Sequence, residues 1–299
     1  WEVTGGRVAE RLEEDHQRAQ GRLQRRVAHR VRPPKGGQYG LAGPGTLWRG
    51  AHRLPVTALA LSGDDSACFS ASKDGAVVRW DVETGARQAF EAPPPPDPKL
   101  TGPVAAPSPW VRDVLSLAVS DDGRYVATGG REKRVHVWDA RSGKHVKAFP
   151  GHRDSVWALA FREGSHELYS GGADRTLKVW NVDDLAYVDT LFGHQAEMVA
   201  MHSAGRSKGR AVSVGRDRTA RVWKIDEDSH LILRSGQVAL ESCAFVSQGG
   251  GEFMTGSDDG SVALWSQMKK RPVQVWRGVH GSAVPPPGGG APPRSRRWS

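Results

Sequence analysis

Residues 151–181 read GHRDSVWALAFREGSHELYSGGADRTLKVWN. This segment contains three short runs rich in β-branched, aromatic and other apolar residues, at 156–161, 168–172 and 176–181, and a fourth run follows at 187–192. Turns rich in Gly and Asp divide the runs, and none of the runs has the length or the 3.6-residue period of a helix. The segment therefore predicts one unit of four short strands.

The same unit recurs along the chain, as the positions of five tryptophans show. These tryptophans are Trp80, Trp138, Trp180, Trp223 and Trp265. The last four are 42, 43 and 42 residues apart, and the first interval of 58 residues is lengthened by a proline-rich insertion. A Ser or Thr lies ten positions before each tryptophan, and an acidic residue lies six positions before it. An interval of about 40 to 45 residues indicates one supersecondary unit repeated, so the sequence predicts five units.

The residues around each tryptophan predict a polar relay inside the unit. A buried indole N–H needs a hydrogen-bond acceptor, and a hydroxyl, an imidazole and a carboxylate can supply one in sequence. A buried carboxylate is tolerated only when it is paired in this way. The spacing from His to Asp is 22 residues in the first and third units and 23 in the fourth. We expect the structural relay to include His52, Ser70, Asp74, Trp80, Thr128, Trp138, His152, Ser170, Asp174, Trp180, His194, Ser213, Asp217, Trp223, Thr255, Asp259 and Trp265.

Two units depart from this pattern. The second has no Gly-His pair and carries Glu132 where the others have Asp, and the fifth has Ser235-Gly236-Gln237 in place of Gly-His. We therefore expect these two units to lack a complete relay and to be looser.

The ends of the units carry a family resemblance. Their openings and closings include Gly151-His152, Gly193-His194, Trp80-Asp81, Trp138-Asp139 and Trp180-Asn181. With these residues the chain resembles the WD40 β-propeller family over 46–280. The resemblance implies an all-β propeller with five recognisable four-stranded blades. In that family the strand at 46–49 would be the outer strand of the last blade, and 278–280 resembles the opening of a sixth blade. We therefore interpret the five blades as truncated from a ring of six or seven.

The segments outside the repeats predict further boundaries. Apolar residues recur at helical spacing in 1–32, whose first half is acidic and whose second half is basic, as suits a helix dipole. This amphipathic α-helix is either a solvated capping helix or an arm that docks a partner or touches RNA. Flexible linker is expected at 33–45, a disordered inter-blade loop at 91–109 and a disordered Pro/Gly/Arg tail at 281–299, with the propeller blades over 46–280.

The composition limits the possible partners and chemistry. The formal net charge is +9 and the isoelectric point is about 9.8, so an anionic partner is plausible. The sequence contains no apolar run of 18 residues, so it does not predict a membrane span. The two cysteines, Cys68 and Cys243, lie in apolar runs and are interpreted as reduced buried thiols rather than a disulfide or metal site.

The sequence does not predict an enzyme. It has no GxxxxGK[ST] loop, HExxH helix or CxxC pair, and we expect no cofactor and no metal site. Ser, His and Asp do recur together, but they recur at one spacing in each complete unit. A repeated structural relay explains this better than a repeated catalytic triad, so no catalytic residue is assigned.

Basic residues gather beside the acidic turns. The residue before each turn acid lies near the face through which propellers usually bind partners, and three of these five residues are basic. The predicted RNA-binding residues are Lys73, Arg131, Lys133, Arg153, Arg175, Arg216 and Arg218. Such a cluster can neutralise phosphates in a salt-dependent way, without aromatic residues for base stacking. The alternative is that these cations only solvate the surface.

Longer runs carry a closer resemblance. They include 7–12, 21–24, 151–154, 188–195, 215–217, 221–225, 256–265 and 269–272. These runs resemble the family of WD-repeat proteins of the U3 small nucleolar ribonucleoprotein, and they include outer-strand and loop residues that propeller packing does not dictate. The resemblance extends over about 7–280.

This closer resemblance implies a function. It implies a nucleolar, non-enzymatic subunit that binds the box B/C region of U3 snoRNA, beside the kink-turn-binding protein of the box C/D particle. Other processome proteins of small-subunit ribosome biogenesis and pre-rRNA processing would be further partners. The family also carries two further blades and an N-terminal extension with basic motifs. The alternative function is a generic WD40 adaptor, such as a ubiquitin-ligase receptor or chromatin scaffold, that binds acidic peptides.

Overall fold

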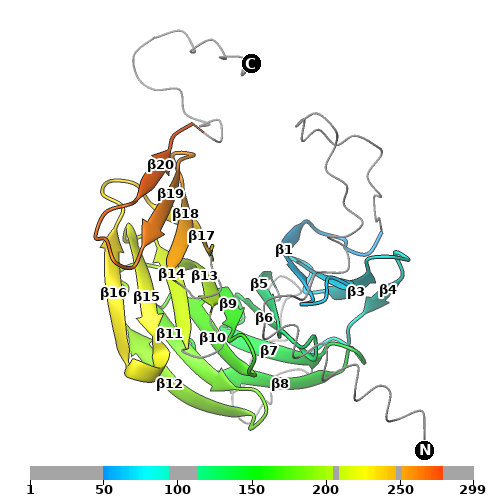
Figure 1. The fold of residues 1–299 in the computed structure, drawn as a ribbon. Coiled ribbons are helices and arrows are strands. Elements are labelled where there is room, and N and C mark those ends of the chain that lie inside the picture. Colours follow the sequence, from blue (N-terminus) through cyan, green and yellow to red (C-terminus); the bar gives the residue numbers. More distant parts are fainter. Residues whose placement is uncertain (1–49, 94–112, 205–208, 247–250, 279–299) are drawn as a thin grey trace, which may run out of the picture. The chain divides into compact units, whose positions relative to one another are not determined.

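The computed structural model describes residues 50–93, 113–204, 209–246 and 251–278. Within these residues, twenty strands form five four-stranded antiparallel sheets, and each sheet contains four strands that are consecutive in sequence (Figure 1). We call these sheets blades 1 to 5. The predicted helix at 1–32, the linker at 33–45, most of the loop at 91–109 and the tail at 281–299 lie outside the described residues.

The chain divides into two compact units, and each is described by itself. Unit 1 ends at Phe192 and contains blades 1 to 3, and unit 2 begins at Gly193 and contains blades 4 and 5. The strands of unit 1 are β1 (Val56–Leu61), β2 (Ala67–Ser72), β3 (Val77–Asp81), β4 (Arg87–Ala89), β5 (Val114–Val119), β6 (Tyr125–Gly130), β7 (Arg134–Asp139), β8 (His145–Pro150), β9 (Val156–Phe161), β10 (Glu167–Gly172), β11 (Thr176–Asn181) and β12 (Ala186–Phe192). The elements of unit 2 are β13 (Met198–Ala204), β14 (Arg210–Gly215), β15 (Thr219–Lys224), the 3-10 helix η2 (Ile225–Glu227), β16 (Ser229–Arg234), β17 (Leu240–Phe245), β18 (Glu252–Ser257), β19 (Val262–Ser266) and β20 (Gln274–Trp276).

The all-β prediction with five four-stranded blades is confirmed. Blade 3 shows the agreement best, because β9 and β11 have the predicted bounds and β10 and β12 differ from them by one residue. In blade 5 the outer strand β20 is short, with only the three residues Gln274–Trp276.

The core of unit 1 lies between the faces of neighbouring blades. Blades 1 and 2 meet in a cluster that includes Phe69 of β2 and Trp138 of β7, and blades 2 and 3 meet in a cluster that includes Val137 of β7 and Trp180 of β11. Each of these tryptophans therefore packs against the preceding blade. All six residues of β6 are buried because that strand has neighbours on both edges and both faces.

A glycine allows the inner strands of blades 2 and 3 to approach closely. A Cβ atom added to Gly129 would lie 2.5 Å from Cγ1 of Val156, the first residue of β9. The hydroxyl of Ser116 in β5 donates to the carbonyl of the same Val156 at 3.4 Å. Between blades 1 and 2, the hydroxyl of Thr57 donates to the carbonyl of Val114 at 2.6 Å. The starts of β1, β5 and β9 therefore lie at one common end of unit 1.

The core of unit 2 lies between blades 4 and 5. It includes Val212 and Val222 from blade 4 and Phe253 and Trp265 from blade 5. The rings of Phe253 and Trp265 are stacked, with centroids 6.2 Å apart and an interplanar angle of 7°. The tryptophan of blade 5 thus packs against the preceding blade, as in unit 1.

Candidate nucleic-acid interface

The relay of blade 3 links its tryptophan to the turn between β10 and β11. The indole N–H of Trp180 donates to the hydroxyl oxygen of Ser170 at 2.8 Å. Nε2 of His152 lies 2.7 Å from the same oxygen, and Nδ1 of His152 lies 2.9 Å from Asp174. The backbone N–H of Arg153 also donates to this carboxylate at 2.9 Å. The relay therefore fixes the position of the turn and of the backbone that precedes β9.

Blade 4 contains the same relay. Trp223 donates to Ser213 at 2.7 Å, His194 lies 2.7 Å from Ser213 and 2.9 Å from Asp217, and the N–H of Gln195 donates to Asp217 at 3.0 Å. Burial raises the pKa of this carboxyl, but the hydrogen bonds from His194 and Gln195 outweigh burial and hold the pKa well below its usual range. The same balance lowers the pKa of Asp174 in blade 3. Both carboxylates are thus ionised and fully used within the fold.

Blade 1 has a looser version of the relay. Trp80 donates to Ser70 at 2.8 Å, and His52 lies 2.7 Å from Ser70. Nδ1 of His52, however, is 3.9 Å from Asp74 and is buried without a hydrogen-bond partner among the described residues. Asp74 instead accepts the N–H of Arg53 at 2.7 Å.

Blade 5 keeps only the first step of the relay among its described residues. Trp265 donates to Thr255 at 2.9 Å, and Asp259 accepts the N–H of Ser261 at 2.9 Å within its own turn. Among the residues that the structure describes, no histidine joins Thr255 to Asp259. This agrees with the expectation, made from Gln237 in the Gly-His position, that the relay of the fifth unit is incomplete.

Blade 2 corrects the prediction for Thr128. The indole N–H of Trp138 donates to the backbone carbonyl of Glu91 at 3.1 Å, in place of the expected Thr128 hydroxyl. Glu132 lies 3.0 Å from His136 of β7, and His136 lies 3.1 Å from His145 of β8. The imidazole that binds the turn acid therefore comes from the next strand of the same blade.

The signal for this second arrangement was present in the sequence. A histidine four residues after the turn acid is a strand neighbour that can reach back to it, and it stands opposite Thr128 in the pairing of β6 with β7. Burial, assisted by the charge of His136, lowers the pKa of His145 to about 4, so this imidazole is neutral at physiological pH.

One backbone hydrogen bond makes the turns of all five blades equivalent. In each, the residue before the turn acid donates its N–H to the carbonyl that precedes the first strand of the blade. These bonds are Lys73 to Pro55 (3.2 Å), Arg131 to Asp113 (3.1 Å), Ala173 to Ser155 (2.8 Å), Arg216 to Glu197 (3.0 Å) and Asp258 to Ala239 (3.2 Å). In unit 1 these turns lie at the end where β1, β5 and β9 begin. The structure thus brings Lys73, Arg131, Lys133, Arg153 and Arg175 to one end of unit 1, and Arg216 and Arg218 to one turn of unit 2.

The residue after the turn acid has a left-handed backbone in every blade. In blades 1 and 5 it is a glycine, Gly75 with φ of 80° and Gly260 with φ of 75°. In blades 2, 3 and 4 it is Lys133 with φ of 61°, Arg175 with φ of 66° and Arg218 with φ of 62°. Glycine adopts this conformation freely, whereas a residue with a Cβ atom pays about 1–2 kcal/mol for it. Three blades therefore place a long cation where glycine is conformationally preferred.

The sequence predicted these three cations as RNA-binding residues only because they lie beside the acidic turns, among other basic residues. The strain itself was missed. Its signal is a Lys or Arg in the position where sister units have the Gly of an Asp-Gly turn.

The seven predicted RNA-binding side chains are all exposed, but two of them are paired with acids. Arg131 lies 3.2 Å from Asp113, and Arg216 lies 3.3 Å from Glu197. Arg218 donates to the amide oxygen of Gln237 at 3.4 Å. Within the part of the chain that the structure describes, Lys73, Lys133, Arg153 and Arg175 make no ion pair. These four cations are the most available to an anionic ligand.

The described residues contain little that points to other chemistry. No group of three or more His, Cys, Asp or Glu side chains among them is arranged to hold a metal ion. Cys68 and Cys243 are free thiols, and burial raises the pKa of Cys243 to about 12. A helix long and apolar enough to cross a membrane does not occur in the described ranges.

The repeated blades match a known family. The family model "WD domain, G-beta repeat" matches residues 46–81, 108–139 and 143–181. This chain is a WD40-repeat protein. The matched segments fall in blades 1 to 3 and contain Trp80, Trp138 and Trp180, the repeating tryptophans of those blades.

Individual relatives and a solved structure agree with this family. "U3 snoRNP-associated protein-like YAO" of Arabidopsis thaliana is 44% identical over 264 residues, which are 87% of this chain and 50% of that protein. "U3 small nucleolar RNA-interacting protein 2" of Homo sapiens is 41% identical over 274 residues, 92% of this chain and 54% of that protein. The solved structure "Structure of U3-55K" has a TM-score of 0.67 and 41% identity, and covers 77% of this chain and 66% of that one. The WD40 chain thus spans about half the length of the curated relatives it matches.

Proposed function

We propose that this WD40 chain is a non-enzymatic RNA–protein scaffold of the U3 small nucleolar ribonucleoprotein. It binds U3 snoRNA in the box B/C region and acts in pre-rRNA processing and small-subunit ribosome biogenesis in the nucleolus. The kink-turn-binding protein of the box C/D particle and other processome proteins are its proposed neighbours. The names of two relatives that align with most of the chain support this proposal, since both refer to U3.

The observation that carries the proposal is the set of three cations with a left-handed backbone. Lys133, Arg175 and Arg218 each adopt a conformation that costs about 1–2 kcal/mol relative to glycine. No ion pair with another described residue offsets this cost. Strained residues persist only where the surrounding structure fixes their conformation, and they cluster at sites of ligand binding. The physical reason to retain a long cation at these turns is therefore its contact with a ligand.

The chemistry of these side chains favours phosphate as the ligand group. Each presents several N–H donors and a positive charge at an exposed turn, and the turn itself is fixed by the relay behind it. Such contacts neutralise the RNA backbone and release counterions, so they give affinity and register without reading bases. We place Lys133, Arg175 and Arg218 first among the RNA contacts, followed by Lys73 and Arg153, and then by the acid-paired Arg131 and Arg216.

A glycine triple variant tests the proposal. In Lys133→Gly, Arg175→Gly and Arg218→Gly combined, the strain that is relieved and the freedom gained by the unfolded chain nearly cancel. We expect the free energy of unfolding to stay within about 1 kcal/mol of the parent. Affinity for a U3 box B/C RNA, measured with the kink-turn-binding protein present, should fall at least tenfold. The slope of log K against log salt should decrease by about 2, because each lost contact to single-stranded RNA removes about 0.7.

A second triple variant controls for net charge. Lys144, Lys147 and Lys269 are exposed and lie outside the turns in question. Their replacement by Gln removes the same charge and should change U3 affinity less than threefold. Equal losses of U3 RNA affinity in the two triple variants would mean that overall charge, and not the position of the three cations, explains the binding. If the glycine variant bound U3 RNA normally but lost an acidic peptide, the WD40 chain would be a protein adaptor instead.

A further inference from the structure

A groove lies in unit 1, at the end of blades 1 and 2 opposite to the turns that hold the basic residues. It has a volume of 790 Å³ and lies between the β1–β2 turn, the β5–β6 turn and the β7–β8 turn, with Arg79 of β3 on one wall. These turns follow the first and third strands of their blades, whereas the strained cations follow the second strand. The groove is therefore separate from the proposed RNA contacts.

The base of the groove is formed where the β1–β2 turn and the β5–β6 turn are in close contact. A Cβ atom on Gly63 would collide with the backbone carbonyl of Asp121, so only glycine lets the β1–β2 turn approach the β5–β6 turn this closely. Phe69, Ala67 and Ala140 are buried beneath the polar lining. The groove thus has fixed walls and a packed base.

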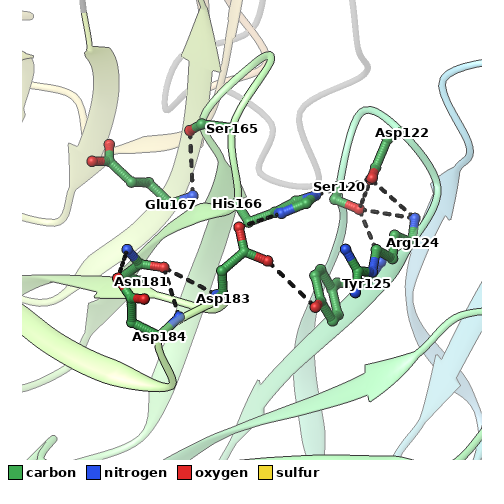
Figure 2. Close-up of polar contacts among 10 residues, drawn as sticks. All are labelled: Ser120, Asp122, Arg124, Tyr125, Ser165, His166, Glu167, Asn181, Asp183 and Asp184. Atoms are coloured by element: carbon green, nitrogen blue, oxygen red, sulfur yellow. Dashed lines mark hydrogen bonds and ion pairs between the residues drawn. The ribbon is translucent and has the colours of Figure 1, made fainter.

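Three of the four carboxylates of the lining accept hydrogen bonds from serine residues of their own turns. Asp64 accepts the hydroxyl of Ser62 at 2.6 Å, and Asp139 accepts the N–H of Ser142 at 2.7 Å. Asp122 accepts the hydroxyl of Ser120 at 2.6 Å and also lies 3.0 Å from His166 (Figure 2). Their hydrogen-bonding capacity is largely committed, so these groups shape the walls and add negative charge.

The guanidinium groups of the lining are not committed in this way. Arg79, Arg124 and Arg141 border the groove, and among the described residues none of them lies within 4 Å of a carboxylate oxygen, although the charges of Arg79 and Arg124 help to lower the pKa values of Asp81 and Asp139. The guanidinium of Arg124 lies 5.0 Å from the centroid of the Tyr125 ring, which holds its stem against β6. Each guanidinium presents a planar fork of donors that matches a carboxylate in a bidentate manner. The guanidinium N–H donors of the groove can therefore bind hydrogen-bond acceptors, such as carboxylates, on a ligand.

The charge balance of the lining selects the class of ligand. Three guanidinium groups stand among four carboxylates, Asp64, Asp121, Asp122 and Asp139. A polyanion such as RNA would be repelled by this surplus of negative charge, whereas isolated carboxylates separated by neutral or basic groups would not. The volume falls in the usual range of ligand pockets, about 300–1,000 Å³. We propose that this groove binds a mixed-charge peptide segment of a partner protein, whose separated carboxylate side chains are held by Arg79, Arg124 and Arg141.

Fluorescence anisotropy on the full chain tests this proposal. The probes are a labelled hexapeptide Gly-Asp-Lys-Gly-Asp-Lys, the same peptide with Asn for Asp, octaglutamate and a twelve-nucleotide oligouridylate. We expect the Asp hexapeptide to bind at least tenfold more tightly than its Asn counterpart. The triple variant Arg79→Gln, Arg124→Gln and Arg141→Gln should lose at least tenfold in affinity for the Asp hexapeptide. The triple Lys variant should lie between, because lysine keeps the charge and loses the bidentate fork.

Two further measurements keep the test decisive. The Gln variant should retain its thermal midpoint and its U3 RNA affinity within twofold, which separates loss of the groove from loss of the fold and from failure of the RNA proposal. A charge control with Gln at Lys147, Lys269 and Lys270, which are exposed and lie outside the three turns of the groove, should leave peptide binding unchanged. Equal binding of the Asp and Asn peptides to the parent chain would overturn the proposal. A second outcome would also overturn it. This outcome is that the Arg79, Arg124 and Arg141 substitutions reduce the affinity for octaglutamate or oligouridylate more than they reduce the affinity for the Asp hexapeptide.

Discussion

Trp180 contributes to blade 3 both by packing and by its hydrogen bond to Ser170. Trp180→Ala removes both, and we expect it to cost about 3–5 kcal/mol of unfolding free energy. Trp180→Phe keeps most of the packing and leaves the Ser170 hydroxyl without its indole donor, at an expected cost of about 1–3 kcal/mol. Urea denaturation measures both. If the Phe variant were as damaging as the Ala variant, the hydrogen bond rather than the packing would dominate.

The acid stability of the chain should depend on Asp174. Its pKa is lowered in the folded state, so its contribution is fully present above the unfolded value of about 3.9 and is lost as pH falls toward the lower folded pKa. Asp174→Asn should therefore destabilise the chain at pH 7, and its deficit relative to the parent should shrink below about pH 4. Thermal midpoints between pH 2.5 and 7 check this.

Asp259→Asn is the matched control for Asp174→Asn. Asp259 is exposed and accepts a bond from Ser261 inside its own turn, without a histidine. Its replacement should cost much less at pH 7. A deficit of the Asp174 variant that stayed constant with pH would show that the His152 pairing does not set the pKa.

Residue spacing predicted the complete relays of blades 3 and 4. It failed in blade 2, where the acceptor of the tryptophan is a backbone carbonyl of the preceding blade. The 22- and 23-residue intervals from His to Asp suffice because both residues border strands of regular length. The acceptor for Trp138 is the carbonyl of Glu91, which comes from the segment after β4 of the preceding blade. No local pattern specifies a backbone oxygen that is distant in sequence, so Thr128 was the natural but incorrect choice.

At the scale of elements, a histidine joins blades 2 and 3. His166, between β9 and β10, lies 3.0 Å from Asp122 of the β5–β6 turn and 2.7 Å from Asp183 of the β11–β12 turn (Figure 2). The hydroxyl of Tyr125 donates to Asp183 at 3.4 Å, and its ring meets the imidazole edge to face at 4.9 Å. Burial lowers the pKa of His166, but the two carboxylates outweigh burial and raise it above its ordinary value.

This clamp should make the stability of unit 1 pH-dependent. Because the folded pKa of His166 is raised, its contribution is fully present below the unfolded value of about 6.5 and is lost as pH rises through the folded pKa. The thermal midpoint of the parent should therefore decrease above about pH 6.5, and that of His166→Gln should decrease less. Calorimetry at pH 6 and pH 9 measures the difference. The same slope in both proteins would assign the effect to other groups.

The strands themselves were predictable, but their irregularities were not. The runs rich in β-branched and aromatic residues, and the Gly and Asp turns between them, predicted β9 to β12 to within a residue. Register shifts between Val137 and Trp138 and between Val179 and Trp180 place one extra residue in each outer strand, Val146 and Val188. The sequence contains no Gly or Pro there that would mark a bulge, so the shift follows from packing rather than from local propensity.

At the scale of the whole molecule, a net charge of +9 favours RNA binding of any sequence at low salt. Asp113 and Glu197 moderate this attraction, because they pair with Arg131 and Arg216 beside the proposed contacts. Asp113→Asn combined with Glu197→Gln removes both of these ion pairs. We expect this variant to bind U3 RNA at least threefold more tightly and with a steeper salt dependence, because two negative charges that compete with phosphate for Arg131 and Arg216 are removed.

A matched pair of substitutions distinguishes local release from overall charge. Glu227→Gln combined with Glu252→Gln adds the same charge, and it frees Lys224, which lies 2.9 Å from Glu227 in the parent. Because these acids lie outside the turns with strained cations, the control should tighten U3 binding and unrelated RNA equally and only slightly. Asp113→Asn with Glu197→Gln should instead raise the ratio of U3 to unrelated RNA affinity at 150 mM salt, where the Debye length is about 8 Å and distant charges are largely screened. An identical ratio in both variants would mean that total charge, rather than the geometry of the turns, governs RNA recognition.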